Sequence, residues 1–474
     1  MSHPVQTWGH QPPAINYLNE HRLAALDAVM GSGKSFITVS HCKSRFAERD
    51  SRTLILCPAA VRGVWRREFH KHAPEQFDGL VLDGDQRSSK KAEMIEEHLQ
   101  RQKGRHRPLF VAINYESFWR KEILNALMAG KFSKVITDES HRIKSHSATC
   151  SKQAWEIVKR GIASRLCLTG TLMPNGPQDI FGQYRFLNDS IFGRYWTHFK
   201  RRYAIENPHI PGMITGWINQ EEFKQKVASI RYHIGPEVLQ LPDKSDIVIY
   251  TKLDPAGRKA YDEMKKESFV ELGVQTESGV PRIASAQNGA VQFLRMLQLA
   301  QGYVKDTEQV ETVTDTQKRR ALLELLEGIN EPVCVYGWFR HDIECVKKCC
   351  DILGRRYGEI SGHRSDLTPH ATMPDDVDIM AVQCKSGSSG IDLTRAAIGI
   401  ILNSGLLSPG DYDQMLARQY RPGQTRNVRF FHLVTEKTVE TKLIDTRGKK
   451  RDLVAAMLAD MVDAGEEIEE ELPW

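Results

Sequence analysis

The chain has 474 residues, which is enough for two or three domains at roughly 150 residues each. Its apolar residues, 41% of the total, suffice for buried cores, but the longest apolar runs, such as 396–402, are far too short to span a bilayer. The sequence opens without a basic segment followed by an apolar one, so we expect no secretion signal. Nine scattered cysteines are typical of a reducing compartment. The composition therefore predicts a cytoplasmic protein and argues against membrane-spanning or disulfide-stabilised secreted classes.

The formal net charge of +5 understates how basic most of the chain is. Residues 463–474 contain six acids and no Lys or Arg, which leaves 65 basic against 54 acidic side chains in the remainder. This excess is compatible with a polyanionic partner without requiring one. The cysteine-rich segment 345–350 could suggest a metal site, but no second Cys/His pair stands at ligand spacing. A half-buried helix is the simpler interpretation.

The first part of the chain alternates short apolar runs with amphipathic stretches. Helical periodicity appears in segments such as 35–49 and 61–72. The predicted strands are 22–29, 52–57, 109–114, 134–138 and 165–170. Short apolar strands separated by helices favour a parallel sheet with helices on both faces.

The same alternation returns after about residue 311. A helix is predicted over 317–329, and the strands that follow are predicted at 332–339, 377–384, 399–403 and 428–434. Aromatic and charged helical stretches lie between the two parts, where the polar loop 273–289 is expected to be mobile. We therefore predict an α/β protein with two tandem domains. Their limits are 1–190 and 311–474, the second including the acidic tail, with a short helical insertion and linker over 191–310.

A phosphate-binding loop is predicted at AVMGSGKS, residues 28–35, where a strand gives way to a helix. Gly31, Ser32 and Gly33 would let backbone N–H groups surround phosphate oxygens. Lys34 would reach the β- and γ-phosphates, and Ser35 would offer its hydroxyl to Mg²⁺. The alternative is a glycine-rich turn with a chance Lys-Ser pair.

A second motif, VITDESH at 135–141, ends an apolar strand in two adjacent acids. Asp138 is expected to hold Mg²⁺, and Glu139 to orient or deprotonate the attacking water. A solvated acidic turn is the alternative. The phosphate loop about a hundred residues upstream favours nucleotide hydrolysis.

With Thr169-Gly170-Thr171 and Gln-x-x-x-Arg-x-x-Arg at 414–421, these motifs resemble, in order, those of superfamily-2 helicases and translocases. LILCPAAVRGVWRREF, DESHRIKS and QYRPGQTRNVRFFHLVTEKTVE are similar to signatures of the Swi/Snf-type branch, the duplex-DNA motors. The resemblance covers nearly the whole chain and implies two RecA-like domains. Short insertions and the lack of an appended module indicate a compact bacterial or phage-type motor, expected to act as a monomer.

The resemblance implies that ATP binds in a cleft between two lobes. Gln11 would read the adenine edge, with a turn residue before proline as the alternative. Gln414, Arg418 and Arg421 are expected to share one helical face. Arg418 and Arg421 would close onto the γ-phosphate, Arg421 stabilising transition-state charge and Gln414 orienting the pair or the water. A basic helix face that contacts DNA phosphates is the alternative.

The resemblance also implies a link from His141 to the motif around Thr169 and Thr171 by hydrogen bonds, with a core histidine as the alternative. Nucleic-acid contacts are expected from loops where this family touches the phosphate backbone. The residues concerned are Asn114, Tyr115, Lys144, Thr169, Lys385 and Ser386. Backbone contacts carry no sequence information, which suits a motor that steps along any sequence.

The function predicted in this way is an ATP hydrolase that uses ATP and Mg²⁺ to translocate along double-stranded DNA. A strand-separating DNA or RNA helicase is the second hypothesis. A non-hydrolysing, nucleotide-gated nucleic-acid-binding protein is the third. The intact set of Lys34, Asp138, Glu139, Arg418 and Arg421 speaks against the third.

Overall fold

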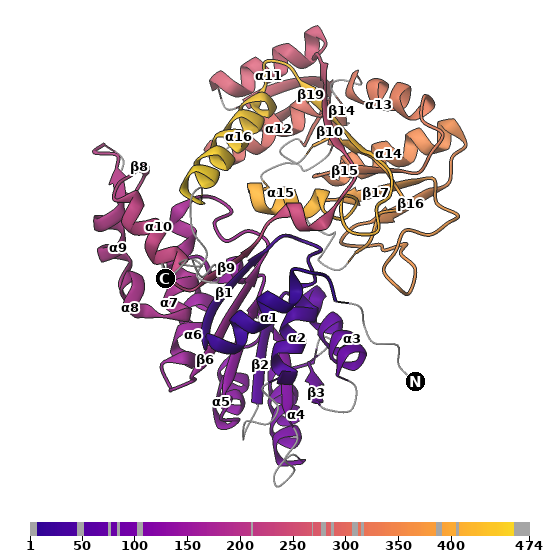
Figure 1. Cartoon of the computed structure of the whole chain (residues 1–474). Helices are drawn as coiled ribbons and strands as arrows, with labels where there is room; N and C mark the ends of the chain where they lie inside the picture. The colour runs from indigo at the N-terminus through magenta and orange to yellow at the C-terminus, as the bar shows by residue number, and fades with distance from the viewer. Residues whose placement is uncertain are drawn as a thin grey trace, which may run out of the picture. The chain divides into compact units, whose positions relative to one another are not determined.

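The protein is represented by a computed structural model in two compact units, residues 1–240 with 452–474, and residues 241–451 (Figure 1). The structure describes residues 7–44, 52–73, 77–82, 86–101, 108–209, 212–267, 269–275, 281–285, 289–305, 311–313, 317–384, 391–403 and 407–458. Within these ranges, no helix combines the length and the apolar character needed to cross a membrane.

The first unit contains a seven-stranded parallel sheet. Across the sheet its strands are β3 (Asp78–Val81), β4 (Leu109–Asn114), β2 (Arg52–Cys57), β5 (Lys134–Asp138), β6 (Ser164–Thr169), β1 (Leu23–Ala28) and β9 (Arg231–Ile234). The five strands predicted for this part are confirmed. Their side chains are buried along nearly their whole length, because helices cover both faces of the sheet.

Helices lie on both faces of this sheet. The helices are α1 (Gln11–Glu20), α2 (Lys34–Ser44), α3 (Arg62–His72), α4 (Ser88–Arg101), α5 (Lys121–Ala129), α6 (Thr149–Val158), α7 (Ile180–Leu187), α8 (Asp189–Phe192), α9 (Trp196–Tyr203) and α10 (Gln220–Ala228). Tyr17, Ile37 and Trp65 of α1–α3 enter one hydrophobic core. The helices α4–α10 contribute side chains to the other core. A small antiparallel pair, β7 (Ala204–Glu206) and β8 (Ile214–Trp217), joins α9 to α10.

The second unit contains a six-stranded parallel sheet. Across the sheet its strands are β10 (Lys244–Thr251), β19 (Val428–Thr435), β18 (Ile398–Ile401), β15 (Val333–Gly337), β17 (Ile379–Gln383) and β16 (Tyr357–Ile360). Its helices are α11 (Pro255–Glu267), α12 (Gly289–Ala300), α13 (Gln317–Glu327), α14 (Arg340–Leu353), α15 (Pro409–Leu416) and the larger part of α16 (Val439–Leu458), whose residues from 452 onward are grouped with the first unit. The predicted α/β class with two tandem parallel-sheet domains is confirmed. The cysteine-rich segment 345–350 lies on α14, a helix as predicted.

The segment 191–310, predicted as an insertion and linker, contributes β9 to the first sheet and β10 to the second. It also holds the small antiparallel pairs β7 with β8 and β11 (Phe269–Gln275) with β12 (Pro281–Ser285). Near its end, β13 (Tyr303–Lys305) pairs with β14 (Glu311–Val313), which lies just beyond the segment. The loop expected at 273–289 is therefore partly strand. The functional limits of the domains stay a prediction.

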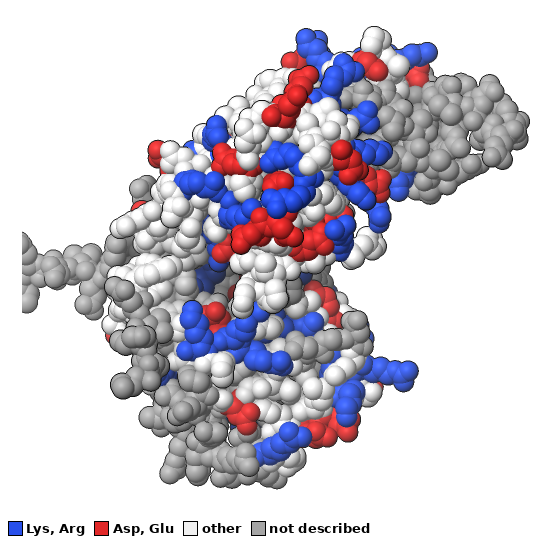
Figure 2. Space-filling model, turned by 90° about the vertical axis from the view of Figure 1, so that its right-hand side faces the viewer, with Lys and Arg blue, Asp and Glu red and all other residues white. Residues whose placement is uncertain are grey.

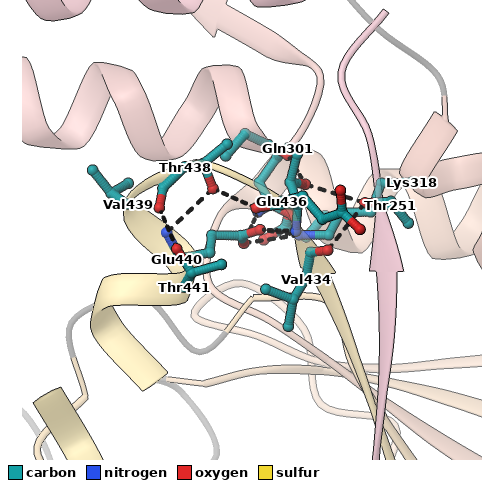
Figure 3. A network of polar contacts seen from close by, with 12 residues as sticks. Thr251, Gln301, Lys318, Val434, Glu436, Thr438, Val439, Glu440 and Thr441 are labelled. Carbon is teal, nitrogen blue, oxygen red and sulfur yellow. Dashed lines mark hydrogen bonds and ion pairs between the residues drawn. The ribbon is translucent and has the colours of Figure 1, made fainter. Parts of the chain in front are cut away.

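A buried polar network ties the corner between β19 and α16 to its neighbours (Figure 3). The Glu440 carboxylate accepts hydrogen bonds from Lys318 Nζ at 2.8 Å, Gln301 Nε2 at 2.5 Å and the Thr435 backbone N–H at 2.8 Å. Lys318 and Glu440 are 5% and 6% exposed. Because the carboxylate and the ammonium are both withdrawn from water, each depends on the other.

Replacing Lys318 with Met is expected to lower the free energy of unfolding by about 3–5 kcal/mol, because it leaves the Glu440 charge buried without its partner. Urea unfolding followed by circular dichroism measures the change. Lys347→Met, at an exposed position on α14, is the matched control. Equal stability of the two variants would show that the buried pair does not hold this corner.

Candidate nucleotide site

Three loops meet at one edge of the first sheet. The neighbouring strands β5, β6 and β1 are parallel, so the segments after Asp138, Thr169 and Ala28 all leave the same carboxyl edge. Ligands of open parallel sheets bind outside this edge. The loops contain the predicted phosphate-binding, acidic and Thr-Gly-Thr motifs.

The phosphate loop runs from β1 into α2, as predicted. Gly31 and Gly33 have φ angles of +89° and +84°, a region that side chains other than glycine rarely adopt. Ser32 is buried, and its hydroxyl donates to the Val29 carbonyl at 2.8 Å. Ser35 is the second residue of α2 and is half-buried. The structure thus brings the predicted loop residues together at a helix N-terminus, where backbone N–H groups favour anions.

Gln11 stands at the start of α1 against this loop and is 5% exposed. Its Nε2 donates to the Ser32 carbonyl at 3.3 Å, and its Oε1 accepts from the Trp8 N–H at 3.0 Å. The His10 Nε2 also donates to the Ser32 carbonyl, at 2.8 Å. One N–H hydrogen and one oxygen lone pair of the Gln11 amide remain for a base edge, because the other N–H binds the Ser32 carbonyl of the loop and the other lone pair accepts from Trp8.

Replacing Gly33 with Ala is expected to weaken ATP binding and to lower stability by about 1–3 kcal/mol, the cost of a strained backbone position. A Cβ at this position would lie 2.5 Å from Gln11 Nε2. Gly63→Ala in α3 is the control, because a Cβ there has no neighbour within 4 Å. Nucleotide titration and urea unfolding of both variants test this expectation. Equal ATP affinity in the two would contradict it.

Lys34 begins α2, and its ammonium donates to the carbonyls of Ala28 at 2.8 Å and Val29 at 3.4 Å. Burial lowers the pKa of Lys34, and the carboxylates of Glu139, Asp138 and Asp27 oppose this shift. The carboxylates of the acidic motif thus favour the charged form of Lys34 in the phosphate loop.

Asp138 ends β5 and is 8% exposed. Its Oδ2 accepts from Trp65 Nε1 at 3.0 Å, and its Oδ1 accepts from the Glu139 backbone N–H at 3.0 Å. Burial raises the pKa of Asp138, and the Lys34 charge and the Trp65 hydrogen bond oppose the rise. Glu139 adopts a left-handed φ of +51°, a strained conformation that concentrates at functional sites.

The side chain of His141 lies beside Glu139, with 3.5 Å between Nδ1 and Oε2. The acidic loop is joined to the loop after β6 by Gln183 of α7, which contacts Ser140 and Leu172. Sequence reasoning missed Gln183. The available signal was a single glutamine within IFGQYRFL, a helix whose residues are all buried.

The residues predicted to contact nucleic acid differ in how far they are buried. Tyr115 is 3% exposed and its hydroxyl donates to the Asp138 carbonyl at 2.7 Å, so this side chain supports the acidic loop and does not face solvent. Asn114 and Thr169 are also buried. Lys144 is 25% exposed and lies 3.5 Å from Asp179. Lys385 and Ser386 lie outside the described residues.

The prediction that Gln414, Arg418 and Arg421 share one helical face is wrong. Helix α15 ends at Leu416, and both arginines lie in the non-helical segment that follows it. Arg421 Nη1 donates to the Ile391 carbonyl at 3.0 Å. Arg418 Nη1 is buried and has no hydrogen-bond partner among the described residues. Burial lowers the pKa of the Arg418 guanidinium, which nevertheless remains charged.

A phosphate loop after β1 and an acidic motif after β5, the two strands that flank β6 in one parallel sheet, define the class of nucleoside-triphosphate hydrolases. The SNF2-related domain matches residues 26–307, more than half of the chain. The protein therefore belongs to the SNF2-related family of helicase-like, DNA-dependent ATPases, which confirms the predicted family and class of enzyme.

Relatives of different size resemble this chain. "Putative protein p41" of Acyrthosiphon pisum secondary endosymbiont phage 1 is 26% identical over 95% of the chain and 98% of its own length. The "DNA repair and recombination protein RDH54" of Saccharomyces cerevisiae is 22% identical over 86% of the chain but only 46% of its own length. The solved "Sulfolobus solfataricus SWI2/SNF2 ATPase core in complex with dsDNA" is 19% identical, with a TM-score of 0.42 over 96% of this chain and 94% of that one.

Proposed function

We propose that the protein is an ATP-driven motor that translocates along double-stranded DNA. The observation that carries this proposal is the arrangement of Lys34 with Asp138 and Glu139, a cation and two acids in loops at the same carboxyl edge of the first sheet. Lys34 would bind the β- and γ-phosphates, and Glu139 would take or orient the proton of the attacking water. The cytoplasmic location and the monomeric state stay predictions.

The residues at this edge fit a magnesium ion held partly by the nucleotide. Mg²⁺ in nucleotide sites takes one or two carboxylates and completes its shell with phosphate oxygens and water. Asp138 and Ser35 supply a carboxylate and a hydroxyl of this kind. Among the described residues no group of three or more His, Cys, Asp or Glu could hold a metal, so the nucleotide would have to provide the other ligands. When bound, the ion would neutralise phosphate charge.

We further propose that Arg418 and Arg421 contact the γ-phosphate during turnover, with Gln414 orienting them or the water. The buried Nη1 of Arg418 supports this role. A buried guanidinium nitrogen without a hydrogen-bond partner is costly in the resting protein, and an anionic ligand would remove that cost.

We propose double-stranded DNA as the polymer along which the protein moves. This proposal rests on family membership and on the name of the yeast relative, a DNA repair and recombination protein. On the face drawn in Figure 2, Lys and Arg are interspersed with Asp and Glu, so charge alone does not mark a DNA path there. Lys144 is the partly exposed cation that we propose for phosphate contact. Binding should then fall steeply with salt.

ATP turnover measured with duplex DNA, single-stranded DNA, RNA or no nucleic acid tests this function. We expect slow turnover alone and strong stimulation by duplex DNA. Equal stimulation by RNA, or none by duplex DNA, would contradict it. Unwinding of the duplex under the same conditions would instead support a strand-separating helicase.

A further inference from the structure

Helix α7 connects the two loops that follow β5 and β6. Its Gln183 side chain is 0% exposed. Ser140 Oγ donates to Gln183 Oε1 at 2.6 Å. Gln183 Nε2 donates to the carbonyls of Leu172 at 2.7 Å and Asp179 at 2.9 Å. One buried amide thus joins the acidic loop to the loop Thr169–Asn175.

Backbone contacts of α7 reinforce this connection on the side of the acidic loop. The Gly182 N–H donates to the Lys144 carbonyl at 3.3 Å. A Cβ at Gly182 would lie 2.1 Å from the Ile143 carbonyl oxygen and 2.6 Å from that of Lys144. Because no side chain fits between α7 and this loop, a shift of either one displaces the other.

The loop Thr169–Asn175 also contacts Asp179, which immediately precedes α7, and the phosphate loop. Asp179 Oδ2 accepts from the Asn175 N–H at 2.7 Å. A Cβ at Gly170 would lie 3.1 Å from Met30 Cγ and 3.5 Å from the Ala28 carbonyl oxygen, so the loop also approaches the phosphate loop. The loop Thr169–Asn175 therefore contacts the phosphate loop directly and is joined to the acidic loop through Gln183.

We propose that Gln183 is a positioning residue that transmits nucleotide-dependent changes of the acidic loop to Thr169–Asn175. The inference rests on the proposed function, because it requires the acidic loop to respond to ATP. Leucine at position 183 would fill a similar volume, but it would leave the Ser140 hydroxyl and the Leu172 carbonyl without this partner. The hydrogen bonds that join the two loops would be lost, while α7 would keep its packing.

Hydrogen exchange with and without a non-hydrolysable ATP analogue measures this transmission. In the wild type, analogue binding is expected to change backbone exchange at 29–35, 139–144 and 171–175. In Gln183→Leu and Ser140→Ala the change at 171–175 is expected to be lost, while 29–35 still responds. Tyr184→Phe is the matched control. It removes another buried hydrogen bond of α7, the 2.5 Å bond from the Tyr184 hydroxyl to the Val227 carbonyl, and should behave as the wild type.

A second readout is the ratio of ATP turnover with duplex DNA to turnover without it. Gln183→Leu is expected to lower this ratio by about tenfold, within the range of roughly 5–150-fold found for coupled sites. The double variant with Ser140→Ala should lose no more than either single variant, because both changes cut one connection. Tyr184→Phe should keep the ratio.

The outcomes separate this inference from the proposed function. No analogue-induced change at 29–35 in the wild type would refute the proposed function and the coupling with it. A response at 29–35 with no response at 171–175 in the wild type would refute the coupling alone. An equal response at 171–175 in Gln183→Leu and in the wild type would also refute the coupling alone.

Discussion

Replacing Glu139 with Gln is expected to leave ATP binding nearly unchanged and to lower turnover by about a hundred- to ten-thousandfold, the usual contribution of a general base. The amide keeps the size of the side chain but cannot take a proton from water. Lys34→Ala should instead weaken ATP binding and turnover together, because Lys34 neutralises phosphate charge in the ground state. Equilibrium nucleotide binding and single-turnover hydrolysis measure the two effects separately.

Glu116→Gln is a suitable control for the Glu139 variant. Glu116 lies near the same sheet edge, but its side chain is 54% exposed and forms a surface pair with Arg142. Turnover in this control should stay close to that of the wild type. Wild-type hydrolysis by Glu139→Gln would refute the role proposed for the acidic motif.

Replacing Arg418 or Arg421 with Ala is expected to lower DNA-stimulated turnover by about a thousandfold or more, the range attributed to arginine fingers. Binding of ATP to the phosphate loop and of DNA without nucleotide should change little. Arg421→Lys should not restore turnover, because a point charge lacks the planar fork of a guanidinium. Arg429→Ala is the control, since Arg429 is 50% exposed and pairs with Glu331 on the surface.

The stability of the Arg418 variant separates a ligand-binding role from a structural one. Because Arg418 Nη1 has no partner among the described residues, Arg418→Ala should keep most of the free energy of unfolding. A large loss of stability would indicate a structural arginine. A loss of DNA affinity with normal basal hydrolysis would show that the arginines bind DNA, the alternative stated above.

Most of the strands that sequence reasoning found are buried along nearly their whole length. The segment 52–57 reads as a continuous apolar run because helices cover both sides of β2. The strand β9, RYHI, shows no such run. Its Arg231 is 2% exposed and donates to Asp27 Oδ2 at 2.8 Å. Arg231 of β9 thus pairs with a residue 204 positions earlier in the chain. Local composition does not predict a strand that depends on so distant a partner.

The site was predictable to the extent that its chemistry is local. The loop around Lys34 and the acids at 138–139 were identified from spacing, and the parallel sheet brings them to one edge. The turn that separates Arg418 from α15 was not predicted, because helical spacing continues past the end of the helix at Leu416. Gln183 was missed because its hydrogen-bond partners lie in two other loops.

Displacement of a triplex-forming third strand from duplex DNA is the most direct test of the proposed motor, because it reports movement along a duplex that stays paired. The wild type is expected to release the third strand with ATP, and to fail without nucleotide or with Glu139→Gln. Stimulated ATP hydrolysis without release of the third strand would contradict translocation on double-stranded DNA.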